Sequence, residues 1–133
     1  MSSIVARVLA VFIALITISN SFLNIFSPES QIASTQLVPQ GIAGLSNFRV
    51  GMGAPFLTAG LLAAFAAWRL RREALIPVMV FFGCVVIARV VGFVVDGYDV
   101  GVAQFTVLAV VILGVATASY RLMPVSNYES NDA

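Results

Sequence analysis

The side chains of this protein that could do chemistry are a few charged and amide groups set inside long apolar runs. In the run ARVVGFVVDG, Arg89 stands seven residues before Asp96, so both lie on one face of a helix, and Gly92 between them opens space beside the backbone. A guanidinium group holds the oxygens of a lipid phosphate, a small carboxylate or a quinone-type carbonyl through paired hydrogen bonds. The spacing therefore indicates either a polar network inside the protein or an anion-binding site.

Further polar groups are expected near Arg89, because the end of the first apolar run and the start of the second fall on its side of the membrane. Arg89 and Asp96 are about 10 Å apart along a helix axis, so a direct pair needs the arginine to snorkel or a bridging water. We expect the Arg49 and Arg89 guanidinium groups to face one cluster, with Asp96 in reach directly or through one water. We call this predicted group the outward cluster; its members are Arg49, Arg89, Asp96, Asn47, Asn20 and Asn24.

The composition sets the class of protein. Of the 133 residues, 60% are hydrophobic and only 10% are charged, which is typical of an integral membrane protein. Histidine is absent and Cys84 is the only cysteine, so the usual zinc sets and a Cys/His nucleophile pair are excluded. The net charge of +1 argues against a nucleic-acid partner. No cofactor, no metal and no catalytic residue is predicted.

Four apolar segments predict the fold, which is an all-α, integral membrane four-helix bundle. Each segment is long enough to cross a hydrocarbon core of roughly 30 Å at about 1.5 Å per residue. Residues 1–123 form this transmembrane domain, and 124–133 are expected to be a disordered cytoplasmic tail, because the segment is polar and begins with Pro124. The predicted helices span about 4–26, 48–68, 74–95 and 102–122.

The arginines predict the orientation of the bundle. An even number of spans brings five of them to one side, which the positive-inside rule makes cytoplasmic. Both termini then face the cytoplasm, as in a multi-pass protein of a cell inner membrane. The loop from Ser27 to Ser46 lies outside and is expected to be partly ordered, as a short interfacial helix over the bundle mouth. The five arginines are Arg7, Arg69, Arg71, Arg72 and Arg121.

Small residues four positions apart, Ala59/Ala63 and Gly60/Ala64, let a neighbouring backbone approach the second helix closely. This pattern favours helix packing within one bundle over a dedicated dimer face. Trp68 ends the same helix and is interpreted as an anchor at the membrane interface.

Two motifs carry a resemblance to a known family. The runs NFRVGMGAPFLTAGLL and ARVVGFVVDG resemble those of small bacterial four-helix membrane proteins catalogued as domain of unknown function 4345. That family has N-x-R before a glycine-rich start to helix two and G-R-x-x-S-x-x-x-D-G at the end of helix three, where this chain has Ala88 for the first glycine and Gly92 for the serine. The resemblance spans most of 4–122 and implies a four-helix inner-membrane fold without an established activity. The positions that match are Asn47, Arg49, Gly51, Gly53, Arg89, Asp96 and Gly97.

Three functional hypotheses follow for the outward cluster. It is a structural network, with Asp99 and Glu29 as further partners for Arg89, or it binds a lipid phosphate or a small anion. Alternatively, the chain is an accessory or assembly subunit of a larger membrane complex. An enzyme is the weakest hypothesis: Asp96 or Glu29 could accept a proton beside an arginine, but nothing in the spacing requires it. The expected partners are membrane lipid and, left open, a homo-oligomer or a larger membrane complex, with no nucleic acid.

Overall fold

The computed structural model describes residues 2–35, 38–97 and 99–124. All regular structure in these ranges is helical, and four helical stretches are long and apolar enough to cross a membrane: Ser2–Phe26, Gly41–Arg69, Arg72–Val95 and Val100–Leu122. The prediction of an all-helical fold with four helices long and apolar enough to cross a membrane is therefore confirmed. The elements are α1 (Ser2–Phe26), α2 (Pro28–Thr35), α3 (Gly41–Phe48), the π-helical segment η1 (Arg49–Gly53), α4 (Ala54–Arg69), the 3-10 turn η2 (Arg72–Ala74), α5 (Leu75–Val95) and α6 (Val100–Leu122).

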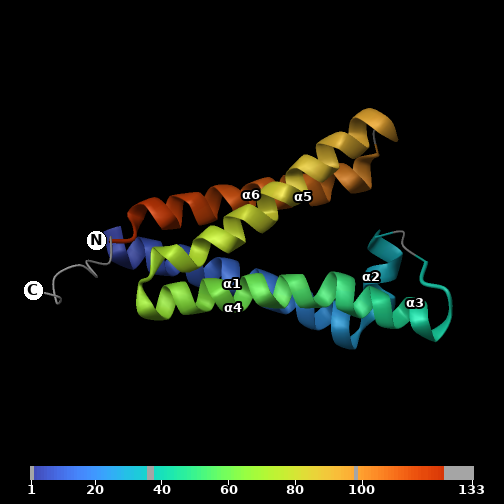
Figure 1. The fold of residues 1–133 in the computed structure, drawn as a ribbon, viewed down its shortest axis with the longest axis horizontal. Helices are drawn as coiled ribbons and strands as arrows, with labels where there is room; N and C mark the ends of the chain where they lie inside the picture. Colours follow the sequence, from blue (N-terminus) through green and yellow to red (C-terminus); the bar gives the residue numbers. More distant parts are fainter. Residues whose placement is uncertain (1, 36–37, 98, 125–133) are drawn as a thin grey trace, which may run out of the picture.

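The bundle consists of two helix pairs, α1 with α4 and α5 with α6 (Figure 1). The pairs lie together where α1 begins, α6 ends and α4 turns into α5. We call this the arginine-rich end, because it carries the five arginines Arg7, Arg69, Arg71, Arg72 and Arg121. Toward the other end, which carries α2, α3 and the α5–α6 turn, the two pairs diverge (Figure 1). We call this the diverging end.

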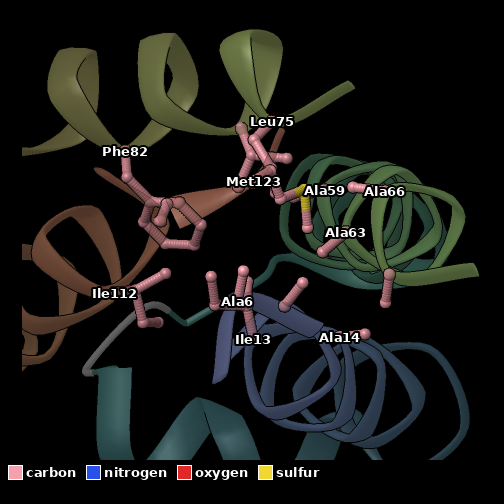
Figure 2. Close-up of a cluster of buried hydrophobic side chains, with 14 of the residues drawn as sticks. Ala6, Ile13, Ala14, Ala59, Ala63, Ala66, Leu75, Phe82, Ile112 and Met123 are labelled. Atoms are coloured by element: carbon pink, nitrogen blue, oxygen red, sulfur yellow. The ribbon is translucent and has the colours of Figure 1, made fainter. Parts of the chain in front are cut away.

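The hydrophobic core lies between the pairs, toward the arginine-rich end. Alanines line the facing sides of α1 and α4, so these backbones approach closely, and a few large side chains fill the remaining space (Figure 2). Phe82 of α5 points toward Ile112 of α6, and Leu75 lies close to Met123. Phe56 of α4 packs edge-on against Phe81 and Phe82, with ring centres 5.8 Å and 6.2 Å away, which joins the two pairs near mid-bundle.

Glycine permits the closest contact between α1 and α4. A Cβ built on Gly60 would lie 2.5 Å from Ile18 Cγ1 and 2.7 Å from Thr17 Oγ1. Gly53, seven residues earlier and so on the same face, meets Ile25 in the same way. The prediction that small residues of the second helix serve packing within the bundle is confirmed, since Ala59 and Ala63 are also buried there.

The second span differs from its predicted bounds of 48–68. It begins at Gly41 and runs through α3, η1 and α4 to Arg69, so α3 continues the line of α4 and does not cover the bundle mouth (Figure 1). The expected ordering of 27–46 is confirmed by α2 and α3, of which α3 extends the second span and α2 lies at the diverging end (Figure 1). The extension is possible because 41–48 is apolar enough to continue a helix, with Phe48 buried. Most of the predicted tail, 125–133, lies outside the described residues.

Candidate functional site

Arg89 lies on the inward-facing stripe of α5. The buried residues of this helix, Leu75, Val78 and Phe82, follow one another at spacings of three and four. Continuing that spacing leads to the partly buried Val85 and then to Arg89, which is itself partly buried. Arg89 therefore lies on the same face of α5 as the residues that form the core near the start of this helix. Neither this guanidinium nor that of Arg49 has an ion pair or hydrogen bond with another residue that the structure describes.

Asp96 caps the C-terminal end of α5 and is exposed. Its backbone N–H donates to the Gly92 carbonyl at 2.7 Å, and its Oδ2 lies 3.8 Å from the point that a Cβ on Gly92 would occupy. The carboxylate thus lies beside the space that Gly92 leaves. Within the described ranges, however, the one ion pair closer than 4.0 Å is Arg72–Glu73, at the opposite end of the bundle.

Asp99, a proposed partner of Arg89, has another role in the structure. Its Oδ1 accepts a hydrogen bond from the backbone N–H of Val102 at 3.1 Å, which caps the start of α6. Aspartate is among the preferred residues at this position, because its side chain satisfies a backbone donor that has no partner within the helix. The turn before it contains Gly97, whose φ of +98° lies in the region that favours glycine.

The asparagines and a serine form a polar stripe on the inner face of α1. Asn24 is only 3% exposed, and its Nδ2 donates to the Asn20 carbonyl at 2.7 Å. One helical turn earlier, the buried Ser21 hydroxyl donates to the Gly53 carbonyl at 2.7 Å, which joins α1 to the π-helical segment η1. Such π segments are rare and frequent at functional sites, and this one begins at Arg49. Sequence reasoning missed Ser21, although it follows Thr17 at the spacing of an inner face.

The members of the outward cluster therefore lie on two separate arms. Arg49 and Asn47 are exposed on the α3–η1 segment, whose η1 part packs against α1, the helix that carries Asn20 and Asn24. Arg89 and Asp96 lie on α5, which diverges from that segment (Figure 1). Neither Arg49 nor Arg89 forms a hydrogen bond or an ion pair with a described residue of the other arm. The structure brings the six residues to one end of the bundle without bringing the two arginines to one contact.

The arginine-rich end shows two further contacts that spacing alone does not predict. The guanidinium carbon of Arg69 lies 5.0 Å from the centre of the Trp68 ring, and that of Arg72 lies 5.3 Å from the centre of the Tyr120 ring. Cations above aromatic faces at such distances are attracted by the ring quadrupole. Beside Trp68, a groove of about 420 Å³ separates the outer surfaces of α1 and α4.

The part of the chain that the structure describes holds no group of side chains arranged for metal binding or thiol chemistry. No group of three or more His, Cys, Asp or Glu side chains there could hold a metal ion. Cys84 is a free and exposed thiol on α5. It lies two residues after the buried Phe82, so it is on the opposite side of the helix from the core.

Comparison with known proteins yields one family. The model of the family described as "Domain of unknown function (DUF4345)" matches residues 5–119, which include every member of the outward cluster and all four spans except their outermost residues. No curated protein and no solved structure matches the chain.

Proposed function

The chain belongs to the family described as Domain of unknown function (DUF4345), a membership that carries no activity, and we propose a function for it on physical grounds. The protein is a small multi-pass protein of a bacterial inner membrane that binds an oxyanion at its diverging end. Arg89 is the ligand that the protein provides, because Arg49 lies on the other arm of the diverging end. The anion is the phosphate of a membrane lipid or a small soluble phosphate or carboxylate.

The single observation that carries this proposal is the environment of Arg89. The residue continues the core stripe of α5, is partly buried, and has no hydrogen-bonding or ionic partner among the described residues. An arginine at the centre of a bilayer costs about 2.5 to 3.5 kcal/mol on insertion scales, and less toward the interface. An anionic oxygen beside the guanidinium offsets that cost through charge-assisted hydrogen bonds.

The proposed orientation has both termini in the cytoplasm. It is supported by the gathering of Arg7, Arg69 and Arg121 at the end where α1 begins and α6 ends. The diverging end then faces the outer leaflet, and the anion is drawn from that side of the membrane.

The anion-binding proposal is tested with the delipidated full chain and two probes, phosphatidylglycerol and inorganic phosphate. We expect at least one of them to raise the melting temperature, and the probe whose effect falls in the Arg89 variants identifies a lipid or a soluble source. Arg89→Gln should reduce that rise in melting temperature. Arg89→Lys should reduce it less, because lysine keeps the charge but cannot form two-point contacts. Arg121→Gln, an exposed arginine at the opposite end, is the matched control.

A structural role for Arg89 gives a different result in the same experiment. If Arg89 holds a buried partner, Arg89→Leu lowers the free energy of unfolding by about 3 to 5 kcal/mol even without added anion. The proposal requires that this variant keep its unliganded stability and respond less to the probe than the unmodified chain does. A large unliganded loss, or an unchanged response, contradicts it.

A second candidate function is that of an accessory or assembly subunit, and the small burial of α5 favours it. Along its 21 residues only Leu75, Val78 and Phe82 are buried, although the helix is highly apolar. A partner helix packed on α5 would be recovered at fixed stoichiometry after purification in mild detergent. If the chain is recovered alone in every detergent tested, the subunit hypothesis is rejected.

A further inference from the structure

The groove between α1 and α4 has a floor of small side chains and walls of large ones. Ala14 and Ala67 are buried and form the floor. Leu15 of α1 is 62% exposed and Trp68 of α4 is 75% exposed, and these side chains stand at its edges. Because the alanines cannot fill the space between such neighbours, a hollow of about 420 Å³ remains, which is within the size range of ligand sites. The full lining is Arg7, Val11, Ala14, Leu15, Ile18, Ala64, Ala67 and Trp68.

The length of the groove corresponds to one leaflet of a bilayer. From Arg7 to Ile18 it follows eleven residues of α1, which is about 16 Å of helix at about 1.5 Å per residue, or half of a hydrocarbon core of roughly 30 Å. Its lining is apolar except at one end, where Arg7 lies together with Trp68. A tryptophan beside an arginine is typical of the interface between acyl chains and headgroups.

The charge at that end is suited to an anion. The Arg7 guanidinium is exposed and has no ion pair with any residue in the described ranges, and Arg69 lies above the Trp68 ring at 5.0 Å. Glu73, the acidic residue of the nearby turn, is already paired with Arg72. A headgroup phosphate level with Arg7 therefore meets positive charge without a competing carboxylate.

We propose that this groove binds one acyl chain of an anionic phospholipid from the leaflet at the arginine-rich end, with the lipid phosphate against Arg7. The length and apolar lining of the groove fit one acyl chain, and the arginines at its end favour an anionic headgroup. A second copy of the chain is a poorer occupant, because a two-fold axis along the membrane normal would bring Arg7 and Arg69 of both copies to one level, where like charges repel. This site is independent of the one proposed for Arg89, which lies at the other end of the bundle.

Trp68 is the only tryptophan of the chain, so its fluorescence reports on the groove without any modification of the protein. The full chain is reconstituted in phosphatidylcholine bilayers that contain increasing amounts of phosphatidylglycerol brominated near the top of its acyl chains. Bromine quenches tryptophan on contact, and the reverse experiment uses brominated phosphatidylcholine with unlabelled phosphatidylglycerol. We expect the anionic lipid to quench Trp68 at a lower mole fraction than the zwitterionic lipid does.

Two variants distinguish a specific lipid-binding site from ordinary contact with bulk lipid. Arg7→Gln should reduce the preference for phosphatidylglycerol about fivefold, which corresponds to the roughly 1 kcal/mol that a basic residue contributes near an anionic surface. Ala64→Leu fills the groove and should lower quenching by both lipids. The matched controls, Arg121→Gln and Ala118→Leu, change exposed residues of α6 outside the lining and should leave the preference unchanged.

The outcomes that overturn the proposal are equally distinct. Equal quenching by the two lipids in the unmodified chain means that the groove contacts bulk lipid only, and this result does not depend on the folding of any variant. A preference that survives Arg7→Gln assigns the selectivity to other arginines and rejects Arg7 as the phosphate ligand. Efficient disulfide crosslinking between copies through Leu15→Cys, in a Cys84→Ala background, would show that a second copy occupies the groove.

Discussion

Replacing Gly60 by alanine tests the close approach of α1 and α4 most directly. The added Cβ would lie 2.5 Å from Ile18 Cγ1, 2.7 Å from Thr17 Oγ1 and 3.1 Å from the Ile18 backbone nitrogen. Thr17 is β-branched and its hydroxyl already donates to the Ile13 carbonyl at 2.7 Å, so it cannot move aside without losing that bond. The helices must therefore separate.

The expected magnitude follows from two opposing effects. Forcing an extra group into a packed interface costs about 1 to 3 kcal/mol. Replacing glycine by alanine within a helix contributes about 0.5 to 1 kcal/mol in the other direction, because the unfolded chain loses conformational freedom. Gly114→Ala is the matched control, since nothing lies within 4 Å of the Cβ that it would add. The difference between the two variants cancels the propensity effect and leaves about 1 to 3 kcal/mol of overpacking.

The assay is reversible unfolding of each variant in mixed micelles with increasing denaturing detergent, followed by Trp68 fluorescence and by helical circular dichroism. We expect Gly60→Ala to unfold at a lower detergent fraction than the unmodified chain, and Gly114→Ala at an equal or higher one. If Gly60→Ala is as stable as Gly114→Ala, then the α1–α4 interface is not close-packed at this point, and the explanation of the glycine is wrong.

Two further predictions concern the helix connections and the orientation. Ser119→Ala removes the hydrogen bond from the Ser119 hydroxyl to the Ala6 carbonyl at 2.8 Å, which joins α6 to α1, and should lower the free energy of unfolding by about 0.6 kcal/mol, with an upper bound of about 1.7; Thr117→Ala, whose hydroxyl bonds only within α6, is the control in the same unfolding assay and should change less. A reporter fused after Ala133 should be cytoplasmic, while a cysteine at Gln40 in a Cys84→Ala background should be labelled by an impermeant reagent from outside the cell; labelling from the cytoplasmic side alone would reverse the proposed topology.

The four spans could be predicted from hydropathy because a membrane helix must satisfy its backbone hydrogen bonds internally, so its length and composition suffice to identify it. The extension of the second span to Gly41 could not be predicted from hydropathy. Residues 41–48 mix apolar residues with glycine, serine and asparagine, and they are helical here where η1 packs on α1 through Gly53. The local helix preference of such a segment is weak, and the helix continues into it from η1, which is held against α1 by tertiary contacts.

The candidate residues divide in the same way. The sequence determined which end of the bundle holds Arg49, Arg89 and Asp96, because successive spans alternate in direction and each residue's depth follows from its place along a helix of known rise. The face of α5 on which Arg89 lies was identified only from the structure, because nearly every residue of this helix is apolar and only burial shows that Leu75, Val78 and Phe82 face inward.

Only the tertiary structure decided which helices lie side by side. Contacts between α1 and α4, such as those of Ile18 with Gly60 and of Ser21 with Gly53, set one pair apart from α5 and α6 and so placed Arg49 and Arg89 on different arms. The groove beside Trp68 arises in the same way, from alanines of two helices that are distant in sequence. Depth in the membrane is a property of one helix, whereas lateral position depends on how the side chains of separate helices fit together, and no single segment carries that information.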